Sequence, residues 1–132
     1  MNYGFVKVAA AVPQVKVADC FYNIQQIEGL MRQASQKEVQ IIAFPELSVT
    51  SYTCMDLFSQ ETLLRNAEKA LLDLVNNTAD LDLLTIVGCP LVSGSQLINA
   101  AVALQRGEIL GVVPKSYLPS YKEFQEERWF TA

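Results

Sequence analysis

Histidine is absent from the 132-residue sequence, and this absence limits the possible chemistry more than any other feature. Without histidine, the chain contains no Ser-His-Asp or Cys-His catalytic arrangement and no histidine-ligated metal site. Any proton transfer must therefore be carried out by glutamate, aspartate, lysine, tyrosine or cysteine side chains.

Cysteine is scarce as well. The three cysteines, Cys20, Cys54 and Cys89, are odd in number, widely spaced and form no C-x-x-C pair. A disulfide framework needs an even set, and a zinc site usually needs closely spaced ligands. We therefore expect reduced thiols and no metal site.

Long apolar runs and an excess of positive charge are also missing. No hydrophobic stretch approaches the roughly 20 residues that span a bilayer, and the first residues lack the pattern of a signal peptide. The net charge is −4, so nothing supplies the phosphate neutralisation that drives most nucleic-acid binding. These absences predict a cytoplasmic protein that binds neither membranes nor nucleic acid.

The composition and the hydrophobic pattern favour a single α/β unit. Hydrophobic residues make up 51% of the chain, which suffices for the core of one domain. Helical spacing predicts an amphipathic helix from an N-cap at Asp19 to about Lys37, and a second over residues 63–77. Short apolar runs predict strands at residues 5–12, 39–44, 83–89, 97–104 and 109–113. This order predicts a mixed sheet with helices on one face.

Two charged residues directly follow prolines at predicted strand ends. Glu46 and Lys115 would emerge at the same edge of the sheet if their strands are near neighbours. Burial would make the glutamate a better base near neutrality, and the ammonium group can stabilise an oxyanion on an attacked amide carbon. Taken alone, each residue also has a structural explanation, as a surface glutamate at a strand end and as a solvated lysine.

The residues around both positions resemble one family. Residues 41–47 resemble the glutamate motif of the nitrilase, or carbon-nitrogen hydrolase, superfamily, residues 111–119 its lysine motif, and residues 98–109 its central hairpin. This superfamily uses a Glu-Lys-Cys triad. The resemblance therefore implies that Glu46 is the general base and that Lys115 stabilises the oxyanion.

The resemblance also implies a fold and a missing partner. The chain would form about the first half of the family's αββα sandwich, so that residues 1–132 are the N-terminal part of a carbon-nitrogen hydrolase domain, ending before its nucleophilic cysteine. Cys54 follows Glu46 closely in the sequence, but the family pattern has an ordinary loop residue there. We interpret Cys54 as incidental, and we expect an apolar sheet face that this chain alone leaves uncovered.

One branch of the superfamily matches further residues. Residues 48–58 and 117–130 are similar to the glutaminase domains of glutamine-dependent NAD synthetases. The similarity implies that Tyr52 and Tyr121 line a glutamine pocket, although simple packing is an equal alternative for both. It also implies that Glu123 is the second glutamate beside the triad.

The same similarity implies a function and partners. Glutamine would be hydrolysed, and its ammonia would pass to a C-terminal synthetase domain that uses ATP and Mg²⁺ to amidate nicotinic acid adenine dinucleotide. The glutaminase domain itself would need no cofactor, and the full-length protein would be a homo-oligomer. Two alternatives stay open: a stand-alone nitrilase-type amidase or carbamoylase, which the sequence of residues 52–58 disfavours, and a non-catalytic fragment that serves folding or assembly.

Overall fold

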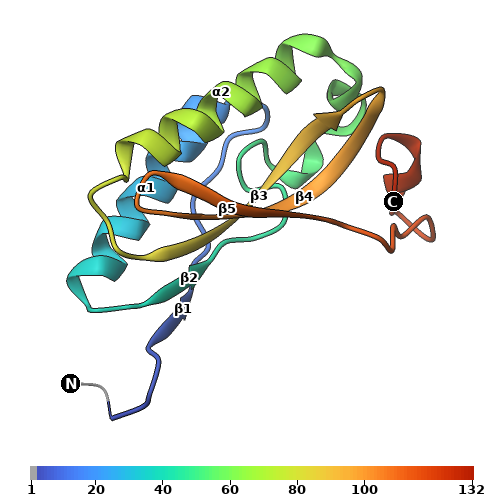
Figure 1. Ribbon diagram of the computed structural model, residues 1–132. Coiled ribbons are helices and arrows are strands. Elements are labelled where there is room, and N and C mark those ends of the chain that lie inside the picture. Colours follow the sequence, from blue (N-terminus) through green and yellow to red (C-terminus); the bar gives the residue numbers. More distant parts are fainter. Residues whose placement is uncertain (1–2) are drawn as a thin grey trace.

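A computed structural model describes residues 3–132, and its framework is a five-stranded sheet (Figure 1). The strands, in their order across the sheet, are β1 (Val8–Ala10), β2 (Ile41–Ala43), β3 (Leu84–Ser93), β4 (Gln96–Gln105) and β5 (Glu108–Pro114). Strands β1 to β3 are parallel, whereas β3, β4 and β5 form an antiparallel meander. The predicted mixed sheet is confirmed.

Two helices, α1 (Cys20–Gln36) and α2 (Glu61–Asn77), lie together on one face of the sheet (Figure 1). Each helix connects two parallel strands, which need a crossover of this length. The carboxylate of Asp19 caps α1 by accepting a hydrogen bond of 3.2 Å from the backbone N–H of Tyr22. Both predicted helices and the predicted cap are confirmed.

The hydrophobic core lies between these helices and the sheet. Apolar side chains at helical spacing on α1 and α2 pack against alternate side chains of β3 and β4. Among the most completely buried are Ile27, Met31, Leu74, Val87 and Val102. This packing fixes the central strands, around which the candidate site is built.

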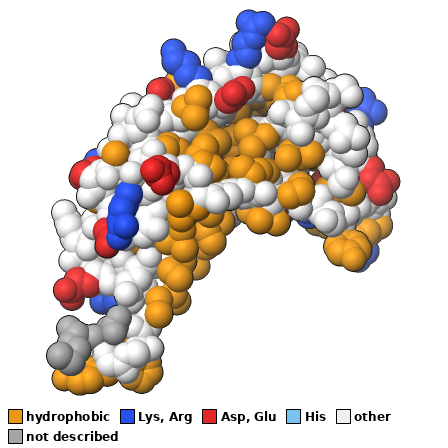
Figure 2. Space-filling model, in the orientation of Figure 1, with side chains coloured by type: hydrophobic (Ala, Val, Ile, Leu, Met, Phe, Trp, Pro, Cys, Tyr) orange, Lys and Arg blue, Asp and Glu red, His pale blue; other side chains and the backbone are white. Residues whose placement is uncertain are grey.

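The opposite face of the sheet is open and apolar. Large apolar side chains on this face, such as Val8 and Val113, are exposed, and so is every residue of the edge strand β5. Figure 2 shows hydrophobic side chains gathered over the strands on the concave side of the molecule. The expectation of an uncovered apolar sheet face is confirmed.

The outer strands and the loops differ from the predicted elements. Strands β1 and β2 have three residues each, and Phe44, just after β2, is buried with its backbone N–H donating to the Ile86 carbonyl oxygen at 2.9 Å. Two 3₁₀ helices, η1 (Tyr52–Ser59) and η2 (Glu126–Arg128), form where we predicted only turns and loop. η1 is interrupted at Met55, whose φ of 53° lies outside the helical range.

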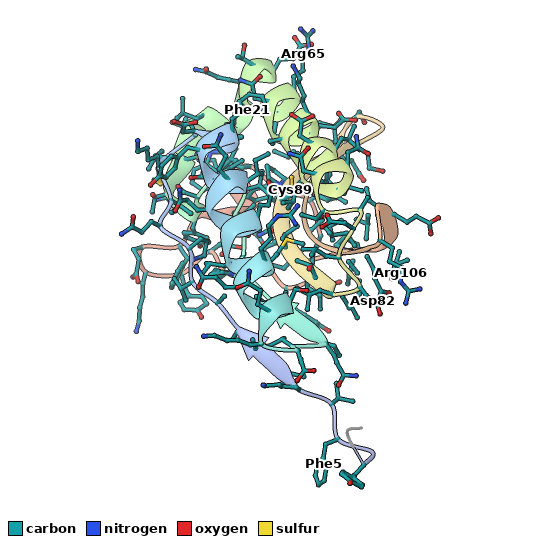
Figure 3. All side chains as sticks on the ribbon, turned by 90° about the vertical axis from the view of Figure 1, so that its left-hand side faces the viewer. Phe5, Phe21, Arg65, Asp82, Cys89 and Arg106 are labelled. Atoms are coloured by element: carbon teal, nitrogen blue, oxygen red, sulfur yellow. The ribbon has the colours of Figure 1, made fainter. Side chains whose placement is uncertain are left out.

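The segment before β1 extends away from the sheet, with Phe5 exposed near its end (Figure 3). Met1 and Asn2, the first residues of the predicted domain 1–132, lie outside the described residues. From residue 3 to residue 132, no helix combines the length and the apolar character that crossing a bilayer requires.

Candidate active site

Glu46 lies in a tight turn that crosses the open face of the sheet after β2. The Val49 backbone N–H donates to the Gly88 carbonyl oxygen at 3.0 Å, and the Gly88 N–H donates to the Ser48 hydroxyl at 3.2 Å. These bonds attach the turn to β3. A Cβ at Gly88 would overlap the backbone nitrogen of Leu47 and lie 2.8 Å from the Glu46 carbonyl carbon. The position of Glu46 therefore depends on the absence of a side chain at residue 88.

Lys115 reaches Glu46 from the end of β5. Its backbone N–H donates to the Asn99 carbonyl oxygen at 2.8 Å, which extends the β4–β5 ladder by one residue. Its Nζ lies 2.8 Å from Glu46 Oε1 and 2.8 Å from Glu126 Oε1. The expectation that Glu46 and Lys115 lie close together at one edge of the sheet is confirmed.

Glu126, in η2, completes an ionic cluster. Its side chain is only 3% exposed, and both of its carboxylate oxygens accept hydrogen bonds. Lys115 donates to Oε1, and the Tyr52 hydroxyl donates to Oε2 at 2.7 Å. A buried carboxylate costs free energy unless it is paired in this way. Glu126 thus pairs with both the Lys115 ammonium group and the Tyr52 hydroxyl.

The electrostatics of the cluster keep Lys115 charged. Burial lowers the pKa of Lys115, but hydrogen bonds and charges from Glu126 and Glu46 outweigh that effect and raise its pKa overall. Burial, then the hydrogen bond to Glu126 and the neighbouring carboxylate charges, raise the pKa of Tyr52. The site therefore holds an ammonium group between two carboxylates and a neutral phenol.

The structure does not bring Glu123 to Lys115, and its role in binding substrate stays a prediction. Its side chain is exposed, and among residues 3–132 the second glutamate that contacts Lys115 is Glu126. The segment contains several glutamates without periodicity, so only the formation of η2 decides which one turns inward. No signal in the sequence singled out Glu126.

The two tyrosines predicted to line a pocket meet through a third aromatic ring. Tyr52 and Tyr121 each make an edge contact with Phe124, with ring centroids 6.5 Å and 5.8 Å apart. Tyr121 is 64% exposed, whereas the Tyr52 hydroxyl is engaged with Glu126. The structure thus places Tyr52 in the ionic cluster and Tyr121 against Phe124, and their role in binding remains a prediction.

A separate ion pair, outside the Lys115 cluster, holds η1 against η2. Asp56 Oδ1 accepts hydrogen bonds from Arg128 Nε at 2.7 Å and from Trp129 Nε1 at 3.0 Å. The Arg128 guanidinium, followed by the Trp129 indole, holds the pKa of Asp56 below its ordinary value. Phe58 packs against the rings of Trp129 and Phe130. Because η1 carries Tyr52 and η2 carries Glu126, this contact supports the hydrogen bond between them.

A cavity of about 320 Å³ opens beside the cluster on the uncovered face of the sheet. Its polar side chains are Glu46, Asn99 and Lys115, and its other lining residues are mostly apolar. The side chains of Glu46 and Lys115 are 39% and 30% exposed, so both remain accessible from the cavity. A small molecule bound there would contact a carboxylate and an ammonium group at once.

The family of this chain follows from comparison with known sequences. The model of the carbon-nitrogen hydrolase family matches residues 7–131. The chain belongs to the carbon-nitrogen hydrolase family. It is 41% identical, over 127 residues, to the glutamine-dependent NAD(+) synthetase of Mycobacterium tuberculosis, a match that covers 96% of this chain and 19% of that protein. The corresponding enzyme of Aquifex aeolicus is 38% identical over 114 residues, covering 86% and 20%. The chain thus spans about a fifth of the length of these relatives.

Solved structures share the fold of this carbon-nitrogen hydrolase chain. A glutamine-dependent NAD(+) synthetase from Cytophaga hutchinsonii superposes with a TM-score of 0.89 at 24% identity, covering 96% of this chain and 22% of that one. A nitrilase-superfamily amidase from Nesterenkonia AN1 superposes with a TM-score of 0.82 at 20% identity, covering 96% and 47%. These likenesses confirm the nitrilase-type fold that the sequence predicted.

The cysteines of this carbon-nitrogen hydrolase chain lie away from the cavity. Cys20, Cys54 and Cys89 are free thiols, all are buried, and none lines the cavity. Figure 3 shows Cys89 between the helices and the sheet. Burial raises the pKa of Cys54, whose thiol donates to the Thr50 carbonyl oxygen. These thiols are protonated core groups and are not placed to attack a substrate beside Glu46.

Proposed function

We propose that this chain supplies the general base and the oxyanion stabiliser for hydrolysis of the glutamine side-chain amide. In the full-length protein, the ammonia would pass to a C-terminal synthetase domain that uses ATP and Mg²⁺ to make NAD. The observation that carries the proposal is the geometry of Glu46, Lys115 and Glu126, in which one ammonium group lies between two carboxylates at the edge of a cavity.

The chemistry assigns one step to each of these groups. A cysteine thiol from outside residues 1–132 gives its proton to Glu46, and its sulfur attacks the amide carbon. The carbonyl oxygen becomes an oxyanion beside the Lys115 ammonium group, whose third N–H is free of the two carboxylates. Glu46 then donates the proton to the departing nitrogen, and the C–N bond breaks. Glu46 next deprotonates a water molecule, whose oxygen attacks the thioester carbon. The C–S bond then breaks, glutamate leaves, and the cysteine sulfur regains the proton from Glu46.

Glutamine is favoured as the substrate by the relatives. The proteins of Mycobacterium tuberculosis and Aquifex aeolicus, which are 41% and 38% identical to this chain, are both glutamine-dependent NAD(+) synthetases. In this proposal Tyr52 and Tyr121 line the glutamine pocket, and the full-length protein is a homo-oligomer. The second candidate is a stand-alone amidase for another small amide, which the fold shared with the Nesterenkonia enzyme favours.

Comparison of amide substrates tests the proposed function. We expect the purified full-length protein to release ammonia from L-glutamine, and to release it from L-asparagine or propionamide at least about 100-fold more slowly in kcat/KM, because a site built for one polar substrate rejects analogues that leave its groups unpaired. The measurement is enzyme-coupled detection of ammonia. Faster turnover of propionamide than of glutamine would favour the stand-alone amidase.

A further inference from the structure

Asn99 is a buried polar side chain on a face of the sheet that is otherwise apolar. Alternation along β4 turns Ala100 and Val102 towards the core, so Asn99 points to the open side together with Ala101. Asn99 is nevertheless only 3% exposed, because the site covers it. Burial of an amide is unfavourable unless its hydrogen bonds are made. The Asn99 side chain therefore needs a hydrogen-bond partner inside the protein.

That partner is the candidate general base. Asn99 Nδ2 lies 2.5 Å from Glu46 Oε1. A carboxylate can only accept, so the amide nitrogen and not the amide oxygen must face it. The backbone carbonyl of Asn99 also accepts from the Lys115 N–H at 2.8 Å. One residue of β4 thus contacts Glu46 through its side chain and Lys115 through its backbone.

The two carboxylate oxygens of Glu46 are consequently not equivalent. Oε1 accepts from both Asn99 Nδ2 and Lys115 Nζ. Within residues 3–132, Oε2 has no hydrogen-bond donor. Two donors on one oxygen fix the rotation of the carboxylate and leave the other oxygen available to take a proton.

We propose that Asn99 is a positioning residue that holds Glu46 Oε1, so that Oε2 acts as the base. The inference rests on the proposed amide hydrolysis. A purely structural role for Asn99 is served by its backbone carbonyl, which any residue provides, whereas the contact with Glu46 requires a side-chain donor. Among residues 3–132, the other charged or titratable groups around Glu46 are Lys115 at the end of β5, Tyr52 in η1 and Glu126 in η2, and the Glu123 carboxylate lies near enough to act on Tyr52.

The test is the pH dependence of glutamine hydrolysis by the full-length protein with Asn99→Asp. This change keeps the size of the side chain but replaces the donor by a carboxylate, which disfavours the charged form of Glu46. We expect the acid limb of the kcat/KM profile to move up by about one pH unit. We also expect kcat to fall roughly 10- to 100-fold, as when other orienting groups are lost, while KM changes less.

Two further variants make the outcome decisive. Asn99→Ala removes the donor without adding charge and is expected to move the acid limb in the same direction, so the pH dependence is readable if Asn99→Asp does not fold. Gln96→Glu makes the same amide-to-acid change at an exposed position of β4 and is expected to keep the wild-type acid limb. A wild-type protein with turnover and an Asn99 variant with an unmoved acid limb would overturn this inference alone. A wild-type protein without turnover would overturn the proposed function and this inference with it.

Discussion

Replacing Glu46 by glutamine in the full-length protein is expected to abolish ammonia release from glutamine. The change keeps the size of the side chain but removes the carboxylate that accepts the proton. Turnover should therefore fall by about 10³-fold or more, which is near the upper limit of what a general base contributes.

Lys115→Ala removes the cation beside the oxyanion and should lower kcat by about 10²- to 10³-fold. Both are measured as ammonia release at saturating glutamine.

Glu123→Gln is the matched control for this pair. It makes the same chemical change in the same chain, but at a side chain that is exposed and does not contact Lys115. We expect it to retain turnover within about threefold of wild type, because exposed positions outside such contacts tolerate substitution. A variant at Glu123 as inactive as the variant at Glu46 would restore the assignment made from the sequence, and would contradict the geometry found here.

Gly88→Ala is expected to have the largest effect on stability. The new Cβ would overlap the backbone nitrogen of Leu47, and backbone atoms cannot move aside as a flexible side chain can. Overpacking of a filled site costs about 1–3 kcal/mol and occasionally more, and we expect at least the upper end of that range. The turn with Glu46 must shift away from β3, so ammonia release should fall as well. Urea unfolding and ammonia release measure the two effects.

Gly29→Ala provides the comparison for that substitution. Gly29 lies inside α1, and a Cβ there would meet no atom within 4 Å. Alanine favours a helix over glycine by about 0.8–1 kcal/mol, so this variant should be as stable as wild type or more so, with unchanged turnover. Equal stability of the Gly88 and Gly29 variants would show that the Glu46 turn does not lie against β3 as described.

Much of the fold was readable from the sequence because its signals are local. Periodic apolar residues mark α1 and α2, and Asp19 marks a cap, so these elements follow from neighbours in the chain. The meeting of Glu46 and Lys115 was also predictable, since both follow strand ends and their motifs resemble those of one family. A strand end fixes where the chain leaves the sheet, even when the partner strand is distant in the sequence.

The rest of the site depends on contacts that no local pattern encodes. Glu126, rather than Glu123, turns inward because η2 forms against η1 through Asp56, a contact between segments 72 positions apart. In the sequence, Asn99 has no feature that distinguishes it from other strand residues, and only the fold brings Glu46 against it. Gly88 reads as a glycine inside an apolar strand, and only the crossing of the turn shows why a side chain is excluded.

The most direct test of the account is to find the nucleophile that works with Glu46 and Lys115. The full-length protein is treated with an electrophilic glutamine analogue that alkylates an attacking thiolate, and the modified peptide is identified by mass spectrometry. We predict one adduct, on a cysteine outside residues 1–132, which is unaffected by Cys54→Ala and forms far more slowly after Glu46→Gln. An adduct on Cys54, or labelling that is equally fast without the Glu46 carboxylate, would contradict the assignment of Glu46 as the base of a nucleophile supplied from outside this chain.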